Sequence, residues 1–61
     1  MGLKKRVKMY NWAVVNMLDG MIFEGAIKEE TSYGLYLHIG GDESRLSLFP
    51  WHVISRVIYK V

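Results

Sequence analysis

The sequence predicts an all-β protein, a small five-stranded antiparallel barrel that is strongly bent. Apolar and polar residues alternate along much of the chain, which is the period of a strand that is buried on one face. Asp19-Gly20 and residues 40–43 are strong turn signals. Gly25 stands inside a predicted strand, where a glycine usually marks a sharp bend.

The size and composition favour a single domain that gains burial by assembly. The chain has 61 residues and no cysteine, so residues 1–61 form one small domain without disulfides or a cysteine-based zinc site. Hydrophobic residues make up 51% of it, which is more than the inside of a small barrel needs. We therefore expect apolar surface to remain for a partner, and a homo-oligomer is the simplest solution.

The basic residues are concentrated at the start of the chain. The net charge is only +2, yet Lys4, Lys5, Arg6 and Lys8 all lie within the first eight positions. They form either a solvated arm or an arm that contacts phosphate groups, and a short helix over residues 4–11 is an alternative conformation. The sequence has no signal peptide and no apolar run near the ~20 residues of a membrane span, so we expect a soluble cytoplasmic protein.

The first strand is predicted over residues 6–18 and the second over residues 21–30. The first is apolar on both faces, which indicates a central strand or one that a neighbouring subunit covers. Asp19-Gly20 predicts a two-residue hairpin turn between the two strands. In the second strand the core face is expected to hold Phe23, Gly25 and Ile27, and the opposite face Glu24 and Lys28.

Three further strands are predicted over residues 35–39, 44–49 and 54–61. Leu35, Leu37 and Ile39 are expected to face the core in the third, and Leu46 and Leu48 in the fourth. In the fifth, Ile54, Arg56, Ile58 and Lys60 alternate against Val57 and Tyr59. Pro50 has no amide proton and should end the fourth strand, with residues 50–53 as one 3₁₀ turn.

This pattern resembles the first motif of the Sm and Sm-like family, which also includes small divergent members in phages. The matching residues are Val15, Leu18, Asp19, Gly20, Phe23, Gly25, Ile27, Leu35 and Leu37, and residues 48–57 stand where that family has its second motif. The resemblance implies a five-stranded barrel whose copies close into a ring, the fourth strand of one copy pairing with the fifth of the next. It also implies single-stranded RNA as a ligand. Pairing of the two free edges in a ring is physically sensible, because it gives hydrogen-bond partners to the backbone groups of both edge strands.

The expected RNA pocket of that family is not matched residue by residue. Gly34 stands at the asparagine position of the Asp-x-x-Asn signature, and Pro50-Trp51-His52 replaces the Arg-Gly turn. Glu29 and Glu30 in the same loop would repel phosphate. The 50–53 turn also resembles the turn before the last strand of Src-homology-type (SH3) barrels, as a geometric similarity only.

The candidate nucleic-acid-binding residues are therefore basic and aromatic: Lys4, Lys5, Arg6, Lys8, Tyr33, Trp51 and His52. Trp51 is equally suited to plug one end of the barrel or to pack in a subunit interface. Tyr10, Trp12, Tyr33 and Tyr36 suit the dry centre of such an interface as well as a base-stacking surface. His38 and His52 are lone histidines, for which a solvated position is the simpler interpretation.

Nothing in the sequence predicts an enzyme, a metal site or a cofactor. It offers no cysteine nucleophile and no Ser-His-acid set with a suggestive spacing, and a barrel of this size hardly encloses a pocket. Two functions stay open: a ring that binds single-stranded RNA without the usual pocket, and a structural or protein-interaction module whose ring is its main product.

Overall fold

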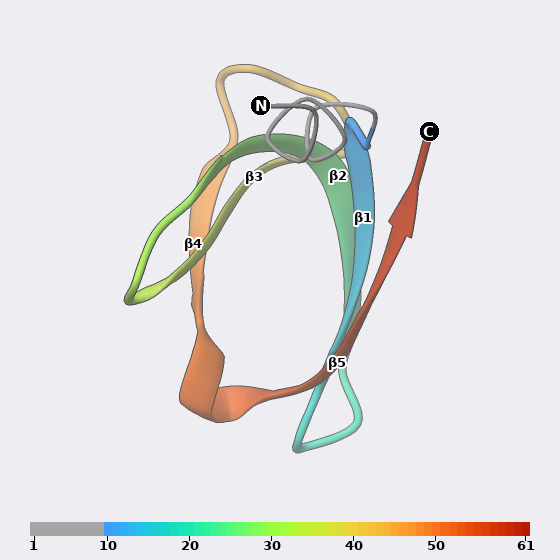
Figure 1. The fold of residues 1–61 in the computed structure, drawn as a ribbon. Helices are drawn as coiled ribbons and strands as arrows, with labels where there is room; N and C mark the ends of the chain where they lie inside the picture. The colour runs from blue at the N-terminus through green and yellow to red at the C-terminus, as the bar shows by residue number, and fades with distance from the viewer. Residues whose placement is uncertain (1–9) are drawn as a thin grey trace.

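The computed structural model describes residues 10–61, and this part of the chain is all β. The strands are β1 (Trp12–Met17), β2 (Ile22–Glu30), β3 (Gly34–Ile39), β4 (Leu46–Pro50) and β5 (Ile54–Lys60), and a 3₁₀ turn, η1 (Trp51–Val53), links the last two. They form one antiparallel five-stranded sheet in the order β4-β3-β2-β1-β5. The sheet curls round on itself, with η1 leading from β4 to β5 (Figure 1). Hydrogen bonds do not close it, so within residues 10–61 β4 and β5 are its two edges.

The first strand is shorter than predicted. It begins at Trp12 rather than near residue 6, and Tyr10 and Asn11 adopt neither strand nor helix. The basic residues Lys4, Lys5, Arg6 and Lys8, and most of the alternative helix over residues 4–11, lie outside the described residues.

The hairpin between β1 and β2 forms where Asp19-Gly20 predicts it, but its loop is longer. The Met17 amide donates to Met21 O, so the loop holds Leu18, Asp19 and Gly20. Only Gly20 has a positive φ, at 94°, and the Asp19 carboxylate accepts the Met21 amide. A two-residue turn would need a positive φ at Asp19 also, and the extra loop residue removes that requirement.

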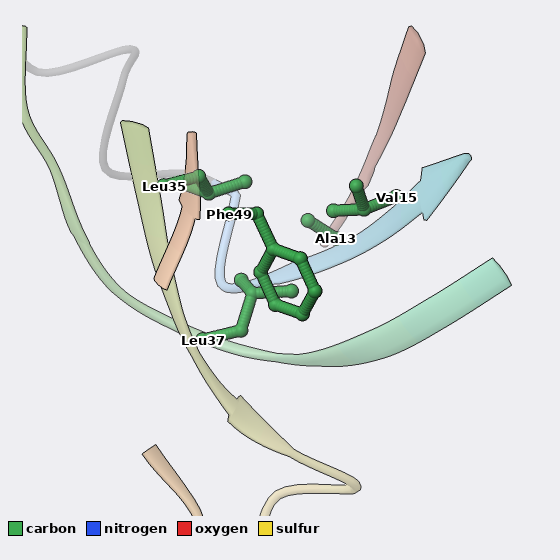
Figure 2. Close-up of a cluster of buried hydrophobic side chains, with 5 residues drawn as sticks. All are labelled: Ala13, Val15, Leu35, Leu37 and Phe49. Carbon is green, nitrogen blue, oxygen red and sulfur yellow. The ribbon is translucent and has the colours of Figure 1, made fainter. Parts of the chain in front are cut away.

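The core lies on the concave side of the curled sheet. Five side chains are buried there, from β1, β3 and β4 (Figure 2): Ala13, Val15, Leu35, Leu37 and Phe49. Phe23 and Ile27 of β2 pack against this cluster, and the Phe23 ring lies 5.3 Å from the Phe49 ring between centroids. The predicted core positions Phe23, Ile27, Leu35 and Leu37 are thus confirmed. Complete burial of a leucine such as Leu37 contributes roughly 1.5–3 kcal/mol.

The predicted inward face of the fourth strand is wrong. Leu46 and Leu48 are exposed, while Phe49 is buried. The register decides this, because Phe49 lies opposite the buried Leu35 and Leu48 lies opposite the half-buried Tyr36. Directly opposed residues share a face, so Phe49 points to the core and the two leucines point outward.

Two bulges change which residues face the core. The register of β5 against β1 shifts at Ser55, so Ile54 and Val57 both pack on the core, and the prediction that Ile54 lies on the face opposite Val57 is wrong. The register of β2 against β3 shifts at Lys28, so Glu30 lies opposite Leu35, on the core side. A bulge inserts one unpaired residue and thereby reverses the side-chain alternation beyond it.

Two glycines allow neighbouring strands to approach closely. A Cβ on Gly25 would lie 2.2 Å from His38 O, and one on Gly34 would lie 2.4 Å from Phe49 O. Any side chain would force the strands apart at these points. Gly34 pairs with Pro50, which is the last residue of β4 rather than a residue beyond the ladder.

Candidate binding surface

The structure brings together three of the predicted site residues. Tyr33 lies in the β2–β3 loop, and Trp51 and His52 lie in η1, which continues from β4 beside that loop. All three are exposed, Tyr33 most of all at 80%. Lys4, Lys5, Arg6 and Lys8 lie outside the described residues, so the structure does not place these cations near the three side chains.

Thr31 fixes the shape of the β2–β3 loop. Its hydroxyl oxygen accepts the amides of Tyr33 and Gly34, each over 3.1 Å, and its own amide donates to Gly34 O over 2.9 Å. Threonine favours this arrangement because its hydroxyl can stand in for a backbone acceptor in a tight turn. The loop therefore presents Tyr33 from a defined backbone.

Trp51 is tied to the same loop by two hydrogen bonds. Its indole Nε1 donates to Thr31 O over 2.8 Å, and its backbone amide donates to Tyr33 O over 3.1 Å. These bonds attach Trp51 to the β2–β3 loop through both its side chain and its backbone. The ring is still 36% exposed, so it also remains accessible to a ligand.

Glu30 and Tyr59 extend this surface, and the sequence did not single out either as a partner of Trp51. The Tyr59 hydroxyl donates to Glu30 Oε2 over 2.5 Å, and the Tyr10 ring lies 5.7 Å from the Tyr59 ring between centroids. Glu30 precedes Thr31, the residue that accepts the Trp51 indole. We call Tyr10, Glu30, Tyr33, Trp51 and Tyr59 the aromatic–acidic surface.

The surroundings of Tyr59 change its acidity. Partial burial, followed by the hydrogen bond to Glu30, raises the pKa of Tyr59 from 10.0 to about 12. Burial disfavours the charged phenolate, and the nearby carboxylate disfavours it further. At neutral pH Tyr59 is therefore a neutral donor, and the negative charge of the pair lies on Glu30.

This bulge-dependent placement explains why sequence reasoning missed the pair. Glu30 and Tyr59 stand almost thirty positions apart, and a simple alternation from Phe23 puts Glu30 on the face of Glu24. Only the bulge at Lys28 turns Glu30 toward the side on which Tyr59 lies opposite the buried Ala13. Simple alternation would put Glu29, not Glu30, at the end of the apolar face, so no local pattern indicates the pair.

Trp12 has a structural role on the convex side. Its indole Nε1 donates to Glu24 Oε1 over 3.0 Å. Its ring also lies close to Gly41, where an added Cβ would be 3.4 Å from the nearest ring carbon. It thus links β1, β2 and the β3–β4 turn. In that turn the Asp42 carboxylate accepts the hydroxyl and the amide of Ser44, which lowers the pKa of Asp42.

The convex side carries a second group of exposed apolar residues. Leu46 and Leu48 lie on the edge strand β4 and Ile58 on the other edge strand, β5, each 40–49% exposed. Leu18, Met21 and Ile22 are exposed at the β1–β2 hairpin. The sequence-based expectation of surplus apolar surface is met in this form, although the sequence assigned the two β4 leucines to the core.

Residues 10–61 contain no cluster of three or more His, Cys, Asp or Glu side chains that could hold a metal ion. Across the same residues, no helix has the length and apolar character needed to cross a membrane. Comparisons with protein-family models, with curated proteins and with solved structures gave no match.

Proposed function

We propose that this chain is a self-assembling module: an Sm-like barrel whose copies join through β4 of one and β5 of the next into a ring, without a catalytic centre. The observation that carries the proposal is the unpaired edge and the exposed apolar side of β4 in the described part of the chain. This edge strand has two leucines exposed on its convex side, Leu46 and Leu48. Within residues 10–61, β4 is a short, largely apolar edge strand without a charged side chain, and an unpaired edge of this kind is a template for pairing with another strand.

The hydrogen bonds of β4 leave half of its backbone groups available. Ile39 N donates to Arg45 O and Trp51 N donates to Tyr33 O, so the bonded pairs of this ladder fall at odd positions of β4. In an antiparallel ladder the alternate residues direct their backbone groups away from the partner. The amides and carbonyls of Leu46 and Leu48 therefore face the free edge.

Pairing of β4 with β5 would bury the exposed apolar residues on both strands. Leu46 and Leu48 lie on the convex side of β4. Ile58 of β5 also lies on the convex side, because it pairs with the convex-side Val14 of β1. Edge pairing between two copies would bring these side chains onto one continuous face. It would remove apolar area from water at about 25 cal/mol per Å², and a ring would satisfy every copy equally.

Light scattering coupled to size exclusion tests this proposal at about 5 and about 50 µM, a range in which moderate subunit affinities become visible. We expect an oligomer for the natural chain and a monomer for Leu48→Lys, because a lysine on an edge blocks pairing. Leu48→Pro is a second variant. It removes an amide that β3 does not use, so the fold should persist while assembly is lost.

Ile22→Lys is the matched control, since Ile22 is an exposed apolar residue on the central strand β2. It should assemble like the natural chain. A monomeric natural chain at about 50 µM, or an unchanged oligomer in both Leu48 variants, would contradict edge pairing.

Binding of single-stranded RNA is the second candidate function. One observation favours it: Tyr33, Trp51 and His52, which the sequence predicts as base-stacking or base-contacting residues, lie at one end of the sheet and are exposed. Each stacked base would contribute about 1–3 kcal/mol. Glu30 opposes it, because a carboxylate beside the aromatic rings repels phosphate.

Fluorescence anisotropy with labelled U-rich and A-rich RNA at two salt concentrations decides this question. RNA bound by the natural chain should dissociate as salt increases, and Tyr33→Leu should weaken the complex. Absence of salt-sensitive binding at about 10 µM would reject RNA as a ligand without affecting the assembly proposal.

A further inference from the structure

We propose that the aromatic–acidic surface binds a cationic side chain, an arginine above all, from an extended segment of another protein. The surface shares the edge strand β5 with the proposed assembly, through Tyr59, but it does not use the convex-side leucines of β4, so Leu48 variants test assembly and Glu30 variants test binding. The proposal rests on two groups of contacts. The Tyr59 hydroxyl donates to Glu30 and the Tyr59 ring packs against Tyr10. Trp51 donates to the backbone of Thr31 and Tyr33, in the loop that follows Glu30.

Glu30 supplies the charge that would select a cation. The contact that the structure shows for its carboxylate is with the neutral phenol of Tyr59, through Oε2. That bond leaves Oε1 as an acceptor and fixes the direction of the carboxylate. A guanidinium presents several N–H donors in a planar fork that matches such an oxygen pair.

The aromatic rings supply the second element of recognition. Tyr33 is 80% exposed on a loop that Thr31 holds in place, and the Trp51 indole donates to the backbone of the same loop at Thr31 O. The faces of Trp and Tyr rings attract cations, by about 0.5–1 kcal/mol at exposed sites and by more when water is excluded. Hydrogen bonds hold the Trp51 and Tyr59 rings before binding, so little entropy is lost on ordering these two rings.

The same arrangement disfavours an anionic partner. A nucleic acid would bring phosphates to Glu30, with Glu29 beside it and also exposed. A cationic segment is attracted by the local charge of Glu30 and Glu29, while the chain's net charge of +2 opposes its binding in general. Binding of an arginine peptide would therefore report this surface and not a general attraction.

The test uses the full chain and a labelled nine-residue peptide with three arginines spaced by glycine and serine. A matched peptide carries citrulline, which keeps the shape of arginine without its charge. Anisotropy and tryptophan fluorescence are followed at two salt concentrations. We expect the arginine peptide to bind at least about tenfold more tightly than the citrulline peptide, because charge-assisted hydrogen bonds are the strong ones.

Variants assign the binding to the surface. Glu30→Gln keeps the acceptor for Tyr59 and removes the charge, and it should weaken the arginine peptide by about tenfold. Glu43→Gln is the matched control, an exposed glutamate in the β3–β4 turn, and it should bind like the natural chain. Tyr33→Leu should weaken binding and Tyr33→Phe should preserve it, since only the ring face is used.

Several results would overturn the proposal. These are equal binding of both peptides, unchanged affinity in Glu30→Gln, and no binding at about 1 mM peptide. Displacement of the peptide by U-rich RNA with an affinity that increases in Glu30→Gln would instead identify a nucleic-acid surface. Peptide binding that emerges only after Lys4, Lys5, Arg6 and Lys8 are all changed to Gln would show that the chain's own basic segment is the occupant.

Discussion

At the scale of single residues, close backbone contacts decide which positions tolerate change. Gly25 and Gly34 both lie where a neighbouring carbonyl leaves no room for a Cβ. At Gly34 the contact with Phe49 O leaves glycine as the residue that lets β3 and β4 pair this closely. Gly20, in contrast, has open space around it and is needed only for its positive φ of 94°.

These two kinds of glycine predict different costs. Gly25→Ala would place a methyl group 2.2 Å from His38 O and should reduce the free energy of unfolding by about 3 kcal/mol or more, since backbone must move. Gly20→Ala should cost only about 1–2 kcal/mol, the strain of an L-residue in the left-handed region. Urea denaturation followed by tryptophan fluorescence measures both, and a larger loss in Gly20→Ala would contradict the structure.

Tyr59 predicts a stability change at high pH. Folding raises its pKa from 10.0 to about 12, so the neutral phenol stabilises the folded state. This contribution is complete below pH 10, decreases as the pH rises through the interval between the two values, and is lost above about 12. Thermal unfolding is therefore followed from about pH 9 to about pH 12, a range that covers both pKa values. Over this range the natural chain should lose stability more steeply than Tyr59→Phe.

The assignment is checked by the absorbance of tyrosinate. The difference between the titrations of the natural chain and Tyr59→Phe isolates this group, and Glu30→Gln should move its midpoint down toward the ordinary range. A midpoint for Tyr59 that Glu30→Gln leaves unchanged would show that the carboxylate has no part in the shift.

At the scale of elements, β4 shows how a strand acquires its inward face. The segment Leu46-Ser47-Leu48-Phe49 offers two apolar faces, and alternation alone favours the one with two leucines. Pairing of Phe49 with Leu35, and contact of its ring with Phe23, select the other. The inward face of β4 therefore carries Ser47 and Phe49, and both leucines stay on the convex side.

This choice predicts opposite sensitivities for neighbouring residues. Phe49→Ala should reduce the free energy of unfolding by about 3–5 kcal/mol, because it removes a buried ring and leaves a cavity. Leu46→Ala should cost less than about 1 kcal/mol when measured on dilute, dissociated chains, since that side chain is half exposed. Chemical denaturation at low protein concentration gives both values. Equal losses in the two variants would contradict the assignment of Phe49 to the core and Leu46 to the surface.

At the scale of the whole molecule, the curled sheet leaves two edges and an exposed apolar face. A chain of this length buries little on its own, so assembly would add stability that the isolated copy lacks. If copies bind through β4 and β5, the melting temperature must rise with protein concentration, because association stabilises the folded state by mass action.

Scanning calorimetry at about 5 and about 200 µM measures this dependence. The natural chain should melt several degrees higher at the larger concentration, while Leu48→Lys should melt at the same temperature in both. A natural chain with no concentration dependence would argue for an isolated fold, and its exposed leucines would then need another partner.

The sequence by itself determined the elements of this protein. Local chemistry is enough to place turns at Asp19-Gly20 and at residues 40–43, to put a 3₁₀ turn after Pro50, and to mark Leu35 and Leu37 as core, because each depends on a few neighbouring residues. The tertiary structure alone decided how the faces combine. Bulges at Lys28 and Ser55 reverse the alternation, and pairing across strands selects Phe49 over the β4 leucines. Glu30 meets Tyr59 for the same reason: their contact depends on register between distant strands, which no local pattern specifies.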